Sequence, residues 1–338
     1  MPASPHPPSS PTTINSAQPR PLIVRLRNWV GDVTLALPLL ERLATAGFAP
    51  VLVGKGWARE LLAGTGWPVH GLPRTASERV ALLRRLREEA LCAQPAFRQA
   101  PVQALCLPDS FSSALELRLA GLRAVGHAWE GRRLLLAHAV PRPRAVHELE
   151  VYWRLGQALL GTAEPPPPAV RLRPTETQLR EAAALRAAHG LPERVIVICP
   201  FSGGTWNGQS KDWPAFADFV AQRLPSLGLP FVVCPGRGDE ERLARERFVG
   251  ATLLPDVDLG VYAALLASSA AMLSNDTGPA HIAAAVGTPL VSVMGPSDPT
   301  LWHPWGPASR VCVLGGRGNW PDEASVMAAV QRAVQAPR

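Results

Sequence analysis

Short apolar segments alternate with amphipathic stretches along almost the whole chain, and this alternation limits the folds open to it. Strands that are separated by helices in this way are typical of α/β proteins with parallel sheets. Amphipathic stretches at about 33–46 and 111–121, and a last one at 322–335, predict helices. The segments that we expect to be strands are residues 21–26, 49–54, 103–108, 124–128, 195–200, 229–235, 251–255, 270–276 and 289–295.

A run of four prolines, residues 165–168, divides this pattern into two halves. Proline has no N–H and a fixed φ, so the run excludes a helix or a central strand. Each half then begins with an apolar strand and a glycine-bearing loop, which predicts two Rossmann-like domains facing a central cleft. We expect the last helix to pack back across the N-terminal domain. The predicted organisation is a disordered tail over 1–20, an N-terminal domain over 21–163, a linker over 164–174, a C-terminal domain over 175–320 and a C-terminal helix over 321–338.

Length and charge narrow the class of protein. The 338 residues, 47% of them apolar, are enough for a large core and about two domains. The net charge of +7 favours acidic partners such as nucleotide phosphates or anionic lipid surfaces, without choosing among them. No basic-aromatic motif indicates nucleic-acid binding, so we expect no nucleic acid. Only Lys55 and Lys211 are lysines, against 32 arginines, so each lysine is of interest.

From the sequence we expect neither an export signal nor a membrane-spanning segment. Its first 20 residues lack the apolar core of a secretory signal, and their Pro, Ser and Thr content predicts disorder. No apolar run approaches the roughly 18 residues that span a bilayer. None of the five cysteines forms a CxxC pair, which argues against a zinc site or a disulfide framework and favours a reduced, cytosolic protein.

Asp276 ends the segment at 270–276, and Thr277 and Gly278 follow it directly before an apolar helix. Free backbone N–H groups and the helix dipole make such a position an anion site. An ordinary helix cap is the competing interpretation, since Asp and Thr are favoured there. A second small-residue turn at 295–299 lies at the same carboxyl edge of the sheet, where ligands of open α/β sheets bind.

The loop after the strand at 195–200 offers a second phosphate site. Ser202, Gly204 and Thr205 suit close contact with an anion, and Lys211 supplies a mobile positive charge. The alternative for Lys211 is a solvated loop lysine. The pair Trp213-Pro214 fits a hydrophobic staple and the proline of a first helical turn.

Carboxylates follow two other strands. Asp32 comes after the first strand and a glycine that permits a tight turn, so it is expected to face the cleft, or else it caps the helix. Glu240 and Glu241 follow the strand at 229–235, where a carboxylate can hold ribose hydroxyls. A solvated first helical turn is the alternative for both. His281 is expected to be a buried helix residue.

These segments together resemble glycosyltransferase family 9, the ADP-heptose:lipopolysaccharide heptosyltransferases. The matching pieces follow the order of the family through nearly the whole chain, and SFSSA within 108–122 resembles the heptosyltransferase II type. The loop between Pro200 and Lys211 is longer than the family pattern. The matching pieces are Gly31-Asp32, residues 108–122, Lys211-x-Trp213-Pro214, residues 276–289 and residues 295–307.

The resemblance implies a GT-B architecture, with an N-terminal acceptor domain and a C-terminal nucleotide-sugar domain, and sugar transfer with inversion. It implies an ADP-heptose donor, a lipid-linked core oligosaccharide acceptor, and a cytoplasmic protein in peripheral contact with the inner membrane. No metal and no cofactor are expected. The alternatives are another sugar nucleotide or acceptor, or a non-catalytic sugar-nucleotide binder. The implied roles are Asp32 as general base, Lys211 as the cation on the departing diphosphate, and Ser202, Gly204, Thr205, Glu240, Glu241, Asp276, Thr277 and Gly278 as donor-binding residues.

Overall fold

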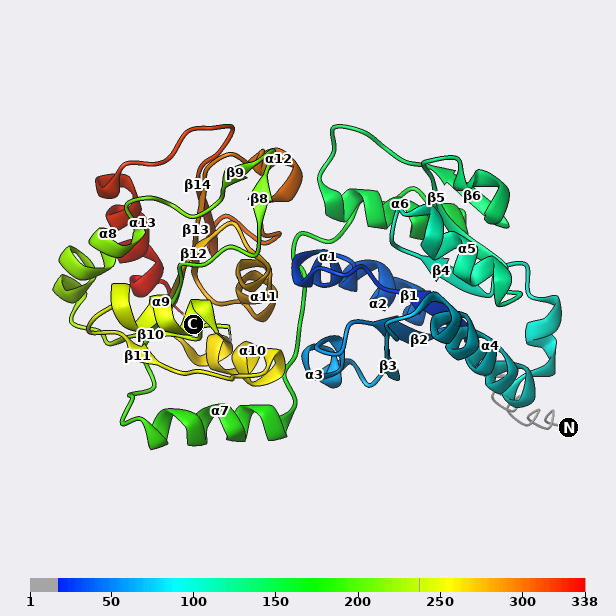
Figure 1. The fold of residues 1–338 in the computed structure, drawn as a ribbon, viewed down its shortest axis with the longest axis horizontal. Coiled ribbons are helices and arrows are strands. Elements are labelled where there is room, and N and C mark those ends of the chain that lie inside the picture. The colour runs from blue at the N-terminus through cyan, green and yellow to red at the C-terminus, as the bar shows by residue number, and fades with distance from the viewer. Residues whose placement is uncertain (1–17, 237, 338) are drawn as a thin grey trace, which may run out of the picture.

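A computed structural model describes residues 18–236 and 238–337 of the chain and has two halves, each built around one parallel sheet (Figure 1). The strands of the N-terminal half are β1 (Arg20–Arg25), β2 (Phe48–Gly54), β3 (Val69–Gly71), β4 (Ala104–Cys106), β5 (Ala124–Ala128) and β6 (His138–Pro141). Its helices are α1 (Val30–Leu35), α2 (Leu37–Thr45), α3 (Ala58–Leu61), α4 (Ala76–Ala93), α5 (Phe111–Leu119) and α6 (Glu148–Leu160), with the short 3₁₀ helices η1 (Ala63–Thr65), η2 (Pro95–Gln99) and η3 (Arg132–Leu135).

The C-terminal half repeats this plan. Its strands are β7 (Ile196–Cys199), β8 (Thr205–Trp206), β9 (Gln209–Ser210), β10 (Phe231–Val233), β11 (Thr252–Leu253), β12 (Ala271–Asn275), β13 (Leu290–Met294) and β14 (Val311–Gly315). Its helices are α7 (Glu176–Ala188), α8 (Phe216–Gln222), η4 (Leu224–Leu227), α9 (Asp239–Arg247), α10 (Leu259–Ser268), α11 (Gly278–Val286), α12 (Pro299–Trp302) and α13 (Glu323–Gln335).

The two large sheets have the same strand order. The first reads β3-β2-β1-β4-β5-β6 and the second β11-β10-β7-β12-β13-β14, and all their strands are parallel. Numbered within its own sheet, each therefore reads 3-2-1-4-5-6, the order of dinucleotide-binding folds. The predicted α/β class with two parallel sheets is confirmed. In such a sheet the order reverses between the first and fourth strands, and the crevice at their carboxyl ends binds ligands.

Local sequence explains where several helices begin and end. Thr75 and Glu78 form a reciprocal capping box at the start of α4, and Thr175 and Gln178 form another at the start of α7. The single helix that we expected at 33–46 is two helices, α1 and α2, which meet at Ala36. Pro38 lies in the first turn of α2, because proline fits a first turn but not a helix interior.

The prediction for the last helix was wrong. Helix α13 packs on the C-terminal sheet, where Val326, Ala329 and Val330 join a core with Leu273 and Val291. A connection of seven residues after β14 delivers the helix to the nearest face of its own sheet, as short connections usually do.

Helix α1 of the N-terminal half packs closely against helix α11 of the C-terminal half where the two halves meet (Figure 1). A Cβ on Gly31 would lie 2.8 Å from the ring of His281, and one on Gly278 would lie 2.7 Å from Cβ of Val30. Gly31 lies inside α1, so the expected tight turn is not there, and its lack of a side chain makes room for His281 instead.

Two features complete the fold. Of the tail expected over 1–20, residues 1–17 lie outside the described residues, and β1 already begins at Arg20. All five cysteines are free thiols, and burial raises the pKa of Cys106 to about 11. No helix within residues 18–236 and 238–337 has both the length and the apolar character that crossing a bilayer requires.

Candidate active site

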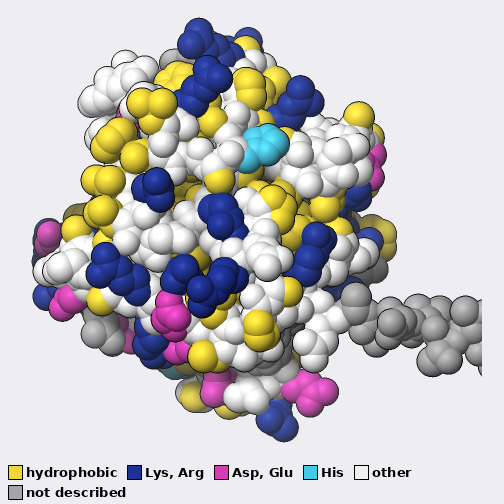
Figure 2. Space-filling view, turned by 90° about the vertical axis from the view of Figure 1, so that its right-hand side faces the viewer, with side chains coloured by type: hydrophobic (Ala, Val, Ile, Leu, Met, Phe, Trp, Pro, Cys, Tyr) yellow, Lys and Arg dark blue, Asp and Glu magenta, His cyan; other side chains and the backbone are white. Residues whose placement is uncertain are grey.

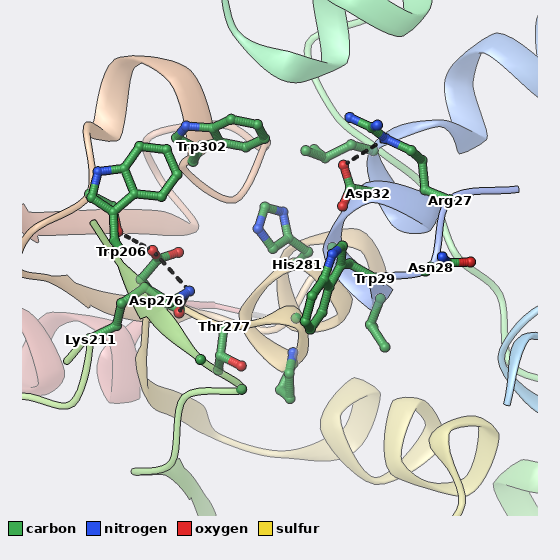
Figure 3. Close-up of a pocket in the computed structure, with 18 of the residues that line it drawn as sticks. Arg27, Asn28, Trp29, Asp32, Trp206, Lys211, Asp276, Thr277, His281 and Trp302 are labelled. Atoms are coloured by element: carbon green, nitrogen blue, oxygen red, sulfur yellow. Dashed lines mark hydrogen bonds and ion pairs between the residues drawn. The ribbon is translucent and has the colours of Figure 1, made fainter. Parts of the chain in front are cut away.

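A cavity of about 670 Å³ lies between the two halves, at the carboxyl ends of both sheets (Figure 3). Residues that follow β1 and β4 line one wall, and residues that follow β7 and β12 line the other. These four strands flank the two positions at which the strand order reverses. The cavity therefore joins two ligand-binding crevices that face each other. The lining segments are residues 27–32, 108–110, 203–206 and 276–279, together with Leu35, Ser113, Lys211, His281, Ser297 and Trp302.

Asp32 lies in the first turn of α1, on the N-terminal wall. Trp29 is the N-cap residue of this helix and its side chain makes no capping bond, so Asp32 does not occupy the N-cap position. Oδ1 of Asp32 accepts a hydrogen bond from the hydroxyl of Tyr152 and lies 3.4 Å from Nε of Arg27. Among the described residues Oδ2 has no partner, so this oxygen is available to a ligand.

Arg27 organises the charges behind Asp32. Its Nε donates to the Tyr152 hydroxyl at 2.9 Å, and its terminal nitrogens pair with Glu148 at 2.9 Å and Asp109 at 3.2 Å. Since arginine can only donate, the Tyr152 proton must point to Asp32. Burial raises the pKa of Glu148, while the ion pairs with Arg142 and Arg27 act against that rise.

Sequence reasoning missed this group of charges. Arg27 lies 121 residues from Glu148 and 125 from Tyr152, and no local pattern links them. The one signal was the unusual position of charged residues next to buried strands: Arg27 follows β1, and Asp109 follows β4. Arg132, which is fully buried, completes the group through an ion pair of 3.2 Å to Asp109.

The C-terminal wall presents a cation beside a helix N-terminus. Nζ of Lys211 donates to the main-chain oxygen of Asp276 at 2.7 Å and lies 3.4 Å from its Oδ2, which also accepts from the Ser297 hydroxyl. Thr277 is the N-cap residue of α11, and its side chain makes no capping bond. The Thr277 hydroxyl and the free N–H groups of α11 are therefore available to an anion next to Lys211.

Asn275 holds the two loops of this wall together, a role that the sequence did not suggest. Its amide donates to the main-chain oxygen of Pro200, and its oxygen accepts from the N–H of Trp213 at 3.1 Å. These bonds tie the end of β12 to the loop after β7 and to the segment that follows Lys211. The side chain is fully buried, so this positioning is rigid.

Of the other predicted donor-binding residues, only two line the cavity. Gly204 and Thr205 line it, whereas Ser202 does not, and the N–H of Ser202 donates to Asp212 at 2.8 Å. Glu240 accepts from the N–H of Gly236 at 2.8 Å. Glu241 pairs with Arg245 at 2.7 Å. Neither glutamate lines the cavity, so their contact with a ribose stays a prediction.

His281 lies on the floor of the cavity between the walls (Figure 3). It is buried in α11, as its apolar surroundings in the sequence suggested. Burial, together with His303 and Lys211, lowers the pKa of His281 to about 3, so the ring is neutral near pH 7. Within the described residues, no group of three or more His, Cys, Asp and Glu side chains could hold a metal ion.

Two facing Rossmann-like halves with a cleft between them are the architecture of GT-B glycosyltransferases, and the comparisons narrow the class further. The model of glycosyltransferase family 9 (heptosyltransferase) matches residues 98–328, more than half of the chain. The chain belongs to this family, as its motifs indicated. Lipopolysaccharide heptosyltransferase 2 of Escherichia coli K12 is 25% identical over 315 residues, which cover 85% of this chain and 86% of that protein.

Other relatives match over shorter stretches. Lipopolysaccharide heptosyltransferase 1 of Pseudomonas aeruginosa is 33% identical over 109 residues, which are 31% of this chain and 30% of that protein. The heptosyltransferase 1 of E. coli K12 is 38% identical over 76 residues, which are 22% of this chain and 24% of that protein. The chain thus spans less than a third of the length of these two relatives.

Solved structures share the fold over almost the whole chain. The E. coli ADP-heptose lipopolysaccharide heptosyltransferase II superimposes with a TM-score of 0.74 and 25% identity, covering 93% of this chain and 98% of that one. The family 9 glycosyltransferase of Veillonella parvula has a TM-score of 0.77 at 18% identity, covering 95% and 98%. The second likeness concerns the fold alone.

Proposed function

We propose that this chain transfers a heptose from ADP-heptose to the inner core of lipopolysaccharide, with inversion at the anomeric carbon. The observation that carries the proposal is the division of the cleft: a carboxylate on one wall, and a lysine with a helix N-terminus on the other. This is the division that inverting transfer requires, since one side must take a proton and the other must stabilise a leaving phosphate. The names of the relatives support heptose as the sugar and lipopolysaccharide as the acceptor.

In the proposed reaction, Oδ2 of Asp32 takes the proton of the acceptor hydroxyl. The acceptor oxygen forms a bond to the anomeric carbon, while the bond from that carbon to the diphosphate breaks and leaves its electron pair on the phosphate. Attack from the face opposite the leaving group inverts the configuration. Lys211 and the N-terminus of α11 stabilise the charge that develops on the diphosphate. Because Lys211 is paired with Asp276 before the donor binds, the diphosphate shares this cation with the carboxylate.

The reaction is tested by incubating the full-length protein with ADP-heptose and a lipopolysaccharide core that lacks its outer heptose. Mass spectrometry is expected to show an acceptor heavier by one heptose, together with released ADP. Activity is expected to persist with excess chelator, since the described residues offer no metal-ligand group. Conversion of the sugar nucleotide without any acceptor, as an epimerase would do, contradicts the proposal.

A lipid-linked acceptor also requires contact with a membrane, and we place that contact on the N-terminal half. Residues 21–163 hold eighteen Lys and Arg against eleven Asp and Glu, whereas residues 164–338 hold fifteen against sixteen. Figure 2 shows the outer end of the N-terminal half, where basic side chains are spread among hydrophobic ones. Four exposed apolar side chains of this half lie on or next to α5 and η3: Phe111, Leu119, Trp129 and Leu134.

Cosedimentation with lipid vesicles tests this contact. The protein is expected to bind phosphatidylglycerol-containing vesicles and to dissociate from them in high salt. It is not expected to bind pure phosphatidylcholine vesicles. Leu134 is 91% exposed, so its change to aspartate is expected to weaken binding without affecting folding. The same change at Val249, which is 79% exposed in the C-terminal half, is the matched control. Equal binding to both vesicle types contradicts the assignment.

A further inference from the structure

The longer loop between Pro200 and Lys211, which the sequence predicted only as a loop, contains a small hairpin. Strands β8 and β9 pair antiparallel, with Trp206 opposite Gln209. The two residues between them, Asn207 and Gly208, have φ values of +48° and +77°. Positive φ at both positions is the signature of a type I′ turn, for which Asn-Gly is the preferred sequence. The turn therefore holds Trp206 in a defined place.

Trp206 packs against a second tryptophan. Its ring centroid lies 5.9 Å from that of Trp302, and the ring planes are inclined by 62°. Trp302 ends the short helix α12, which begins where the Asp298 side chain accepts from the N–H of Thr300 at 2.9 Å. An edge-to-face pair at this separation is a favourable aromatic contact, so each ring restricts the other.

The tryptophan pair lies on the same side of the cavity as the proposed phosphate site. Figure 3 shows Trp206 and Trp302 on the side of Lys211 and Asp276, whereas Asp32 and Trp29 lie on the opposite side. The hairpin that carries Trp206 ends one residue before Lys211. In a nucleoside diphosphate sugar, the sugar is bonded directly to the terminal phosphate. A donor whose diphosphate lies at Lys211 thus has its sugar within reach of the two indoles.

The chemistry of the two rings suits a sugar. Both side chains are only partly buried, so part of each apolar ring faces the cavity. A sugar ring has an apolar face of C–H groups, and covering an indole with that face removes apolar surface of both partners from water. The nearby polar groups are left to the phosphates and hydroxyls, which is the usual division of labour in a ligand pocket.

We propose that Trp206 and Trp302 form the wall of the subsite that holds the transferred sugar of the donor. This inference rests on the proposed function, because it takes the donor to be a sugar nucleotide whose diphosphate binds at Lys211. It adds a residue pair that contacts the sugar and not the nucleotide. The pair therefore contributes to the affinity for ADP-heptose but not to the affinity for ADP.

Calorimetric titration of the full-length protein with ADP and with ADP-heptose tests the proposed sugar subsite. In Trp206→Ala the Kd for ADP-heptose is expected to rise by about 10-fold, while the Kd for ADP stays within about 2-fold of wild type. Trp206→Phe keeps an aromatic face and is expected to recover most of the affinity. Trp67→Ala, which removes a partly exposed tryptophan that does not line the cavity, is the matched control and is expected to leave both constants unchanged.

The possible outcomes distinguish a failure of the sugar-subsite proposal from a failure of the proposed function. Unchanged affinity for ADP-heptose in Trp206→Ala contradicts the proposed sugar subsite. An equal loss of affinity for ADP and for ADP-heptose contradicts it too, because both results mean that the indole does not contact the sugar. Failure of the wild-type protein to bind ADP-heptose contradicts the proposed function itself. A melting temperature within about 2 °C of wild type shows that the variant is folded.

Discussion

The two halves of the molecule share one strand order but present different chemistry at the place where that order reverses. In the N-terminal half, the carboxyl ends of β1 and β4 are followed by Arg27 and Asp109, which pair with each other at 3.2 Å. In the C-terminal half, the ends of β7 and β12 are followed by small residues, hydroxyls, and one lysine that pairs with the carboxylate of Asp276. The comparison teaches that topology supplies two facing crevices, whereas the loops decide which charged and polar groups each crevice presents.

The largest expected effect tests the proton side of this comparison. Asp32→Asn keeps the shape of the side chain but cannot take a proton, so turnover is expected to fall by about 10² to 10⁴. The affinity for ADP-heptose is expected to stay unchanged, because the carboxylate lies opposite Lys211 and Asp276, where we propose that the donor binds. Single-turnover assays and calorimetry measure the two quantities.

A matched control separates the base from a structural carboxylate. Asp258 caps α10 by accepting from the N–H of Gly260 at 2.8 Å and does not line the cavity. Asparagine caps a helix about as well as aspartate, so Asp258→Asn is expected to keep both rate and stability. If Asp32→Asn also keeps the wild-type rate, Asp32 has no place in the reaction.

The next effect tests the anion side. Lys211→Ala removes the cation from the leaving diphosphate and is expected to lower turnover by about 10² to 10³. Lys211→Arg is expected to recover only part of the rate, because a planar fork replaces a compact ammonium group. The control is Lys55→Ala, since Lys55 is the other lysine of the chain and is exposed. Equal rates in the two alanine variants would show that Lys211 has no part in the reaction.

A smaller effect is expected where the N-terminal half positions its carboxylate. Tyr152→Phe removes the hydrogen bond to Oδ1 of Asp32, and bonds to charged groups contribute about 1.5–3 kcal/mol. We therefore expect kcat to fall by about 10- to 100-fold while the Kd for ADP is unchanged. Tyr262→Phe changes the other tyrosine, buried in the C-terminal half, and is expected to leave kcat unchanged. A lower melting temperature with wild-type kcat would show that Tyr152 is merely structural.

The smallest effect concerns the contact between the halves. Nδ1 of His147 accepts from the N–H of Leu149 at 3.2 Å, so Nε2 carries the proton that it donates to the main-chain oxygen of His303, at 2.9 Å. Burial, and to a smaller extent His303, lowers the pKa of His147 to about 3, against about 6.5 in an unfolded chain. Between these values the unfolded state binds a proton that the folded state does not, so stability falls as the pH falls.

Melting curves at pH 7 and pH 5 test this pH dependence. The decrease in Tm between the two pH values is expected to be smaller by about 2–4 °C in His147→Asn, because asparagine does not titrate. His189→Asn replaces an exposed histidine and is expected to leave the decrease as it is in wild type. An equal decrease in all three proteins would contradict a buried, neutral His147.

Much of the fold could be predicted because buried parallel strands are continuous apolar runs. The segments at 195–200 and 289–295 contain the observed β7 and β13 for that reason. The hairpin at Trp206 was not predicted, although Asn207-Gly208 is a dipeptide that indicates such a turn. Strands of two residues have no hydrophobic periodicity to detect. The packing of α13 was predicted wrongly, since an amphipathic pattern shows that a helix has an apolar face but not which sheet covers it.

The sequence by itself determined nine of the twelve strands in the two large sheets and the polar residues that follow them, because these depend on neighbours within a few positions. Only the tertiary structure decided which of those residues meet. Tyr152 reaches Asp32 across 120 residues, and Lys211 reaches Asp276 across 65. Such pairs depend on strand order and on the packing of α1 against α11, which bring distant segments to one cleft. No local pattern encodes that proximity, because the energy of a contact depends on where two segments lie in space and not on their separation along the chain.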